Sequence, residues 1–367
     1  MVRIAYDHQI FASQKYGGIS RYIFELADKI ASTPDTEVGI ISPLYVNAYL
    51  AAASSDLQVI GWKMSMIRRT GRIRRAINQL LVPSMMARFQ PDIVHETYYS
   101  ARRVAPVGGK VVLTVHDMIH ERFPECFSAQ DTTSKQKAMA VERADHLICV
   151  SEQTRKDLIE LLNVDPAKTT VVHHGFSLTK SLTDEGPGSG RPYLLYVGSR
   201  GGYKNFEALL RAYAAKPTWQ RDYDLVTFGG GALTIQERSL MEHLGIRTDQ
   251  VRQVGGDDAV LAGLYQQAAL FVYPSLYEGF GIPPLEAMSF DCPVVCSNVS
   301  SIPEVVGDAA ELFDPSSSEA LGGAIERVLS DAILRQALVM RGRERVKLFS
   351  WEKCAEQTLD VYRRLLS

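Results

Sequence analysis

Cysteine is scarce in this chain, and the few copies are scattered. The 367 residues include five cysteines, Cys126, Cys149, Cys292, Cys296 and Cys354. They form no C-x-x-C pair, and their number is odd. This spacing argues against a disulfide framework and against the common zinc and redox motifs, which use paired cysteines. We therefore expect a protein of a reducing compartment, the cytoplasm.

The chain also lacks long hydrophobic runs and an excess of charge of one sign. Nowhere do about 18 uncharged apolar residues follow one another, as a membrane-spanning helix requires. Residues 1–7 predict a strand that meets a charge too early for a signal peptide. The formal net charge of -2 argues against general nucleic-acid binding, which needs a strongly basic domain. The sequence therefore predicts a globular protein that neither spans a membrane nor binds nucleic acid.

What the chain does have is an alternation of strand-like and helix-like segments, the pattern of a parallel sheet covered by helices. Strands are expected at residues 2–6, 38–42, 93–94, 111–115, 147–150, 170–173, 193–197, 225–228, 268–273 and 293–296. Helices are expected at residues 20–31, 63–89, 151–162, 206–213 and 234–243. Residues 181–190 (SLTDEGPGSG) have the composition of a linker. The sequence thus predicts two doubly wound α/β domains, residues 1–180 and 191–350, with a ligand between them at the carboxyl ends of strands.

One segment joins two carboxylates through a turn rich in glycine and proline. Glu278 and Glu286 lie eight positions apart, with Gly279 and Gly281 between them. Pro284 fits the first turn of a helix, and Glu286 would lie in that same turn, with Glu278 just outside it. Glycine lets the backbone approach a ligand closely, and free N–H groups at a helix N-terminus attract an anion. The segment therefore predicts a site for a polyhydroxylated, phosphorylated ligand.

Four segments together carry a family resemblance. They are residues 273–288, 196–205 (YVGSRGGYKN), 114–117 (TVHD) and 17–22 (GGISRY). The chain resembles the retaining glycosyltransferases of family 4 over nearly its whole length, most of all the branch of bacterial O-antigen and exopolysaccharide mannosyltransferases. The resemblance implies a GT-B fold of two Rossmann-like domains facing across a cleft, the second holding the nucleotide-sugar donor and the first the acceptor. It also implies that a final helix at 351–367 crosses back to the first domain.

The second domain supplies the expected donor contacts. Arg200 and Lys204 follow strand 193–197, where α/β folds collect ligands. A transferase without a metal needs such cations to neutralise the leaving diphosphate, and we expect no metal and no other cofactor. The resemblance implies that Glu286 binds the ribose hydroxyls and that Glu278 binds a hydroxyl of the donor sugar. The other donor contacts that it implies are Gly279, Phe280, Gly281 and Ile282, the last three through backbone N–H groups.

The first domain supplies the remaining candidates. Gly17 and Gly18 precede a helix with Ser20 as a candidate N-cap, so the backbone there can approach the diphosphate or the acceptor; an ordinary glycine turn is the alternative. His116 follows strand 111–115 at the same sheet end, and the resemblance implies that it lies close to the reacting sugar. The candidate acceptor contacts are His95, Tyr98, Tyr99 and Asp117.

Three other signals are less specific. Asp222 and Asp224 have the D-x-D form of a metal-binding pair but precede a strand, so we interpret them as a surface turn at the wrong sheet end. Residues 229–231 lack the full G-x-G-x-x-G pattern, and no nicotinamide cofactor is expected. Basic residues alternate with apolar ones in the stretch 63–75, which is typical of helices on anionic membrane surfaces. A solvated helix face is the alternative for this stretch.

These observations lead to one main hypothesis and two alternatives. The main hypothesis is a metal-independent, retaining hexosyltransferase in which His116, Arg200, Lys204 and Glu278 are catalytic. Its donor would be GDP-mannose, with UDP and dTDP sugars still open, and its acceptor a saccharide, lipid-linked if the basic stretch docks on the inner leaflet of the cytoplasmic membrane. The alternatives are a sugar-nucleotide epimerase of the same fold and a non-catalytic module that binds nucleotide sugars or saccharides.

Overall fold

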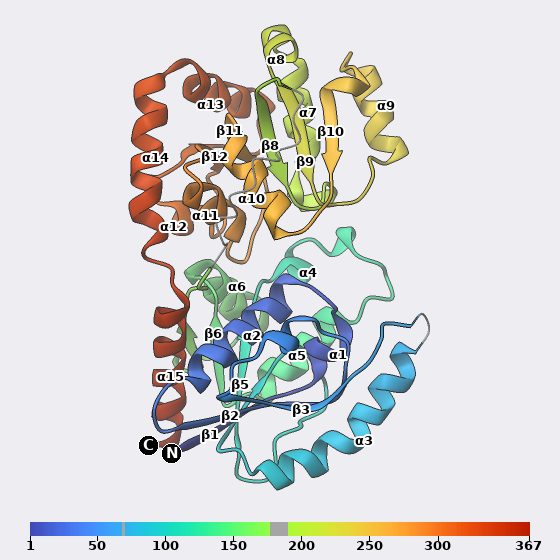
Figure 1. Cartoon of the computed structure of the whole chain (residues 1–367), viewed down its shortest axis with the longest axis vertical. Helices are drawn as coiled ribbons and strands as arrows, with labels where there is room; N and C mark the ends of the chain where they lie inside the picture. The colour runs from blue at the N-terminus through green and yellow to red at the C-terminus, as the bar shows by residue number, and fades with distance from the viewer. Residues whose placement is uncertain (68–69, 177–189) are drawn as a thin grey trace. The chain divides into compact units, whose positions relative to one another are not determined.

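The computed structural model describes residues 1–67, 70–176 and 190–367. Internal packing divides the chain into two units (Figure 1). Unit 1 comprises Met1–Gly175 and Trp351–Ser367, and unit 2 comprises Phe176–Ser350. The predicted linker at 181–190 lies outside the described residues, apart from Gly190.

Unit 1 is built on a parallel sheet with the strand order β3-β2-β1-β4-β5-β6-β7. Its strands are β1 (Val2–Tyr6), β2 (Thr36–Tyr45), β3 (Leu57–Lys63), β4 (Ile93–Glu96), β5 (Lys110–Val115), β6 (His146–Cys149) and β7 (Thr169–Val171). The direction of winding reverses between β1 and β4. Doubly wound folds bind ligands at such a switch point, at the carboxyl ends of the strands.

Two cores lie on opposite faces of this sheet because successive strand residues point to opposite sides. Ile4 and Tyr6 pack with α2 and α15, whereas Ala5 packs with α3. The helical segments of unit 1 are α1 (Gln9–Ser13), α2 (Gly18–Ala31), η1 (Tyr49–Ala52), α3 (Gly71–Phe89), α4 (Ile119–Arg122), η2 (Pro124–Cys126), α5 (Thr133–Arg143), α6 (Glu152–Leu162), η3 (Pro166–Lys168) and α15 (Trp351–Leu366). The C-terminal helix therefore belongs to unit 1, as the resemblance implied.

Unit 2 repeats the design with a parallel sheet of order β10-β9-β8-β11-β12-β13. Its strands are β8 (Tyr193–Val197), β9 (Asp224–Phe228), β10 (Val251–Val254), β11 (Leu270–Tyr273), β12 (Val294–Ser297) and β13 (Glu311–Phe313). Its helical segments are η4 (Gly202–Lys204), α7 (Phe206–Ala214), α8 (Pro217–Asp222), α9 (Ile235–His243), η5 (Thr248–Gln250), α10 (Asp258–Gln267), α11 (Ile282–Ser289), α12 (Ile302–Val306), α13 (Ser318–Ser330) and α14 (Ala332–Val346). The switch point lies between β8 and β11.

The predicted fold class, two Rossmann-like α/β domains, is confirmed. Three strands were missed, namely β3, β10 and β13, and all three lie at a sheet edge. Edge strands are only partly buried, so they lack the continuous apolar run that marks a central parallel strand. The helix predicted at 63–89 is wrong at its start, because Lys63 ends β3 and α3 begins at Gly71.

Candidate active site

The loops after β8 and β11 bring together two of the predicted donor residues. The Lys204 ammonium lies 2.7 Å and 3.0 Å from the two carboxylate oxygens of Glu278. Their side chains are 17% and 9% exposed, so the pair is shielded yet reachable by a ligand. Lys204 also lies over the rings of Tyr203 and Tyr273, with its nitrogen 5.3 Å and 5.8 Å from their centroids. An ammonium held between a carboxylate and two ring faces forms a cationic subsite at the switch point of unit 2.

Two serines that the sequence did not single out hold the loop around Glu278. The Ser300 hydroxyl donates to the Glu278 carbonyl at 2.6 Å and accepts from the Glu278 N–H at 3.2 Å. The Ser301 hydroxyl lies 2.9 Å from the carbonyls of both Glu278 and Phe280. These bonds fix the backbone, while the Glu278 carboxylate pairs with Lys204 and also bonds to the Tyr273 hydroxyl. A Ser-Ser pair after a strand carries no sequence signal for this role, because its partners are main-chain atoms 20 residues away or more.

Helix α11 begins directly after a glycine and has Pro284 in its first turn, as the sequence predicted. Gly281 is the N-cap with φ 94°, a left-handed conformation that glycine adopts without strain. The following prolines, Pro283 and Pro284, have no N–H group. The N–H donors at this helix start are therefore concentrated at and before Ile282.

Glu286 was predicted in the first turn of α11 and lies just past that turn. It is the fifth residue of α11, so it is not in the first helical turn. Its carboxylate accepts a hydrogen bond from the Tyr265 hydroxyl at 3.1 Å. The favourable interaction with the helix dipole falls off within the first turn, so this interaction contributes less at Glu286 than its predicted place implied.

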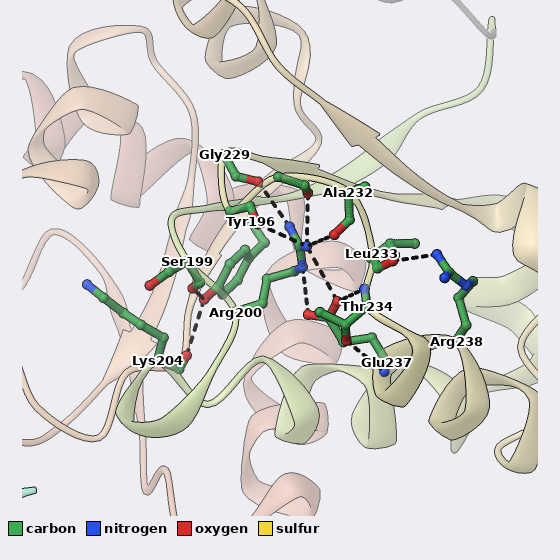
Figure 2. A network of polar contacts seen from close by, with 12 residues as sticks. Tyr196, Ser199, Arg200, Lys204, Gly229, Ala232, Leu233, Thr234, Glu237 and Arg238 are labelled. Carbon is green, nitrogen blue, oxygen red and sulfur yellow. Dashed lines mark hydrogen bonds and ion pairs between the residues drawn. The ribbon is translucent and has the colours of Figure 1, made fainter. Parts of the chain in front are cut away.

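Arg200 and Lys204, which were predicted to act together, have different surroundings. The Arg200 guanidinium is inside a cage made by the turn after β9 and the start of α9 (Figure 2). It donates to the carbonyls of Gly229, Gly231 and Ala232, each at 3.0 Å, and to Glu237 at 2.7 Å. Its side chain is 2% exposed, whereas Lys204 points away from it (Figure 2). Arg200 thus holds a glycine turn instead of presenting its charge to solvent.

The two aspartates of the D-x-D form are confirmed at the far end of the sheet, but they do not form a single surface turn. Asp224 is the first residue of β9, is buried, and lies 3.3 Å and 3.5 Å from Arg191 and Arg252. Asp222 is partly exposed and pairs with the neighbouring Arg221 at 2.7 Å. Arg252, which pairs with Asp224, lies near the start of β10, away from the carboxyl edge where the donor residues gather.

In unit 1, His116 follows β5 at the carboxyl edge, as predicted. Its backbone N–H donates to the Tyr99 hydroxyl at 3.3 Å, and the edge of the Tyr22 ring faces it at 5.2 Å between centroids. Burial lowers the pKa of His116 to about 4; Asp117 opposes this shift and Lys137 adds to it. Its Nε2 atom has no hydrogen-bond partner among the described residues. His116 is therefore a neutral imidazole whose Nε2 atom is buried and unpaired in the part of the chain that the structure describes.

Two of the predicted acceptor contacts are structural residues. His95 is fully buried, with its ring nitrogens 2.5 Å from the Tyr362 hydroxyl and 2.8 Å from the Thr114 hydroxyl, so it fastens α15 to the sheet. Tyr99 is 4% exposed and supports His116. The prediction failed because a strand-end position does not reveal which way a ring points. Tyr98 and Asp117 stay partly exposed and remain candidates.

The turn at Gly17 and Gly18 lies at the start of α2. Gly17 is the N-cap, and Ser20, the predicted N-cap, is the third helical residue, whose hydroxyl donates to the Gly17 carbonyl. No heavy atom lies within 4 Å of the position that a Gly18 Cβ would take. This start of α2 therefore has room for a ligand beside the backbone.

The switch point of unit 1 also contains acidic residues that the sequence did not reveal. Asp7 accepts from the N–H and hydroxyl of Thr97 at 3.1 Å and 2.5 Å, which joins the ends of β1 and β4. Glu96 is buried against Arg143. Burial and then the nearby Asp7 raise the pKa of Glu96 to about 8, although Arg143 opposes the shift. Across residues 1–67, 70–176 and 190–367, no group of three or more His, Cys, Asp or Glu side chains is placed to hold a metal ion.

The architecture defines the class of protein. The chain aligns with sucrose-phosphate synthase from Thermosynechococcus elongatus with a TM-score of 0.79 at 23% identity, covering 100% of this chain and 99% of the other. It aligns with HepE from Anabaena, solved with UDP and glucose, with a TM-score of 0.74 at 18% identity, covering 99% and 100%. Two Rossmann-like domains of this kind are the GT-B fold of glycosyltransferases.

Sequence comparison then gives the family. The model described as Glycosyltransferase Family 4 matches residues 16–180, and the model described as Glycosyl transferases group 1 matches residues 179–345. The O-antigen chain mannosyltransferase B of Escherichia coli is 32% identical over 385 residues, covering 97% of this chain and 99% of that protein. The chain belongs to glycosyltransferase family 4.

Proposed function

We propose that this glycosyltransferase moves a mannosyl group from GDP-mannose to a saccharide hydroxyl, with retention of the anomeric configuration. The observation that carries the proposal is the pair of Lys204 and Glu278 at the carboxyl edge of unit 2. A cation suits the diphosphate of a sugar nucleotide, and a carboxylate suits the hydroxyls of its sugar. The name of the E. coli relative supports mannose as the transferred sugar.

Lys204 has the main electrostatic task in this scheme. As the bond between the anomeric carbon and the phosphate oxygen breaks, negative charge grows on the leaving diphosphate, and a cation held in place stabilises that charge. The diphosphate would compete with Glu278 for the Lys204 ammonium, which releases the carboxylate to accept hydrogen bonds from the sugar. Backbone N–H groups of Phe280, Gly281 and Ile282 add donors without a metal. We therefore expect transfer to persist in EDTA.

We assign the acceptor, together with His116, to unit 1. To retain the configuration, the acceptor would approach the same face of the sugar that the diphosphate leaves. The new bond then forms between the anomeric carbon and the acceptor oxygen, while the acceptor proton passes to the leaving phosphate oxygen. Because its imidazole is neutral, His116 adds no positive charge beside the sugar. Its unpaired Nε2 atom is buried, so the surrounding loop must open before this atom bonds to a sugar hydroxyl. In this proposal Arg200 acts indirectly, by fixing the turn at 229–232 beside the donor loop.

A donor panel combined with product analysis tests the proposal. Thermal shift against GDP-, UDP- and dTDP-sugars should show the largest rise in melting temperature with GDP-mannose, since a ligand at 100 times its Kd stabilises by about 2.7 kcal/mol. Mass spectrometry should then show a longer saccharide. An isomerised nucleotide sugar would instead indicate an epimerase. Binding without any product would indicate a binding module.

We further propose that the acceptor is lipid-linked and that unit 1 docks on an anionic membrane. No helix among residues 1–67, 70–176 and 190–367 is long and apolar enough to cross a bilayer. The surface from the end of β3 through α3 nevertheless exposes large apolar side chains, which are Trp62, Met66, Ile67, Ile73, Ile77 and Leu80. Lys63, Arg72 and Arg75 are exposed on the same segment. Apolar side chains beside cations are the composition of an interfacial surface.

The predicted basic stretch is only partly available for such docking. Arg74 is buried, and its Nε donates to the Ala12 carbonyl at 2.7 Å, so it anchors α3 to α1. Arg68 and Arg69 lie outside the described residues.

Membrane docking is therefore best tested by vesicle flotation of a variant with Lys63, Arg72 and Arg75 changed to Glu. The triple variant should lose binding to anionic vesicles, whereas Arg221→Glu with Arg247→Glu, two exposed arginines of unit 2, should keep it. Equal binding of both variants would remove the membrane proposal and leave the transferase proposal intact.

A further inference from the structure

A lysine that no motif includes is completely buried in unit 1. Lys137 lies in α5, and its side chain is 0% exposed. Its ammonium donates to the Glu121 carboxylate at 2.7 Å and to the Asp117 carbonyl at 2.9 Å, with the Asp117 carboxylate at 3.8 Å. It also lies over the Tyr99 ring, 5.2 Å from the centroid.

Stability alone does not account for a lysine at this place. Removing an ammonium and a carboxylate from water costs several kcal/mol for each ion, and apolar side chains of similar size often serve a core as well or better. Met would fill nearly the same volume as Lys137. The role of the buried charge therefore lies in the residues that it contacts.

Lys137 holds the residue after His116 and the tyrosine that bonds to the His116 backbone. Asp117 follows His116 directly, and its carbonyl and carboxylate both face the ammonium. Tyr99, whose ring the ammonium touches, accepts the backbone N–H of His116 through its hydroxyl. Removing Lys137 would thus loosen the turn after His116 and the tyrosine that supports it.

We propose that Lys137 is a positioning residue that fixes His116 and Asp117 for glycosyl transfer. This inference rests on the proposed function. Since Lys137 is fully buried, it contacts no ligand and acts only through these neighbours.

The same ammonium also influences the charge of His116. The titratable groups that face or influence His116 are Asp117, Lys137, Tyr22, Tyr99, His95 and His174. Burial is the main cause of the low pKa of His116, and Lys137 lowers it further while Asp117 raises it. A second cation next to Lys137 is unfavourable, so Lys137 helps to keep the imidazole neutral.

Steady-state kinetics of three variants test the positioning role. Lys137→Met should lower kcat by about tenfold or more while the KM for the donor changes by less than about twofold, because misplacing a reacting group by about 1 Å can cost 10²-fold. Lys137→Arg, which keeps the charge, should recover part of the loss. Lys135→Met makes the same change on an exposed position of the same helix and should leave kcat unchanged. An unchanged kcat in Lys137→Met would overturn the inference.

A second measurement does not depend on transferase activity. NMR titration of the His116 imidazole should show a higher pKa in Lys137→Met than in the natural chain. If the single variant does not fold, Lys137→Met with Glu121→Gln leaves no buried charge unpaired and replaces it in both measurements. Should the natural chain prove to have no transferase activity, the proposed function fails, and an unchanged His116 pKa would then overturn this inference separately.

Discussion

The loop after β5 in unit 1 and the loop after β11 in unit 2 are held in place by different means. The first is held by a buried ammonium, Lys137, and by the Tyr99 hydroxyl. The second is held by the hydroxyls of Ser300 and Ser301, which bond to its main chain. Neutral hydroxyls fix a backbone without adding charge, so Lys204 and Glu278 remain free to respond to an ionic ligand. The buried Lys137 ammonium, in contrast, fixes a loop and also lowers the pKa of His116 on that loop.

Removing Arg200 should have the largest effect on stability. Arg200→Met leaves the partly buried carboxylate of Glu237 without its cation and three carbonyls without their donor, and each buried polar group left unpaired costs about 1–3 kcal/mol. We expect a large fall in the melting temperature of unit 2, measured by calorimetry. The control is Arg238→Met at an exposed position in α9. A stable Arg200→Met protein that has lost only donor binding would mean that Arg200 contacts the diphosphate after all.

Removing Lys204 should affect catalysis more than stability. Lys204→Ala should lower kcat by about 10²- to 10³-fold, as the loss of one preorganised charge-stabilising donor does. The melting temperature should fall less than in Arg200→Met, because Lys204 bonds to one carboxylate whereas Arg200 bonds to a carboxylate and three carbonyls. Asp222→Ala removes an exposed ion pair at the other sheet end and should retain full activity. The measurement is the rate of transfer from GDP-mannose by Lys204→Ala and by Asp222→Ala. Nearly normal turnover in Lys204→Ala would separate the cationic subsite from catalysis.

His116 should make the stability of unit 1 depend on pH. Its pKa is about 4 in the folded chain against 6.5 for an ordinary histidine, so between these values the unfolded chain binds a proton that the folded chain does not. Stability therefore rises with pH across this window and is lost as pH falls, by about 3 kcal/mol.

The matched measurement compares melting curves of the natural chain and His116→Gln from pH 4 to 7. The variant should lose less stability on acidification, while His243→Gln, at an exposed position, should follow the natural chain. Because the raised pKa of Glu96 is common to all three proteins, it cancels in the difference. Identical slopes of melting temperature against pH in the natural chain and His116→Gln would mean that the imidazole is solvated in the folded chain.

Ser301 should give the smallest effect. Ser301→Ala removes the hydroxyl from two carbonyls of the Glu278 loop, at a cost of about 1–3 kcal/mol for buried groups left unpaired. We expect a higher KM for the donor with a smaller change in kcat than Lys204→Ala causes. Ser330→Ala, which removes an exposed hydroxyl bonded within α13, is the control. Unchanged donor binding in Ser301→Ala would show that the loop keeps its shape without the serine.

The sequence predicted those parts of the site that depend on local pattern. The ends of β5, β8 and β11 could be located, and with them His116, Lys204 and Glu278, because central parallel strands are apolar runs followed by glycine or polar residues. Side-chain direction could not be read in this way. His95 lies within β4 and Arg200 follows β8, yet one is bonded to Tyr362 of the last helix and the other to the turn at 229–232.

Length, composition and periodicity by themselves determined that this chain folds as two doubly wound α/β units, since hydrophobic spacing fixes which elements form. The resemblance of four segments to known sequences further implied family 4. Only the tertiary structure decided which charges are available to a ligand. Lys204 and Arg200 are four positions apart, but packing buries one guanidinium against carbonyls and leaves the ammonium facing Glu278. That choice depends on contacts with residues more than 25 positions away, which no local pattern contains.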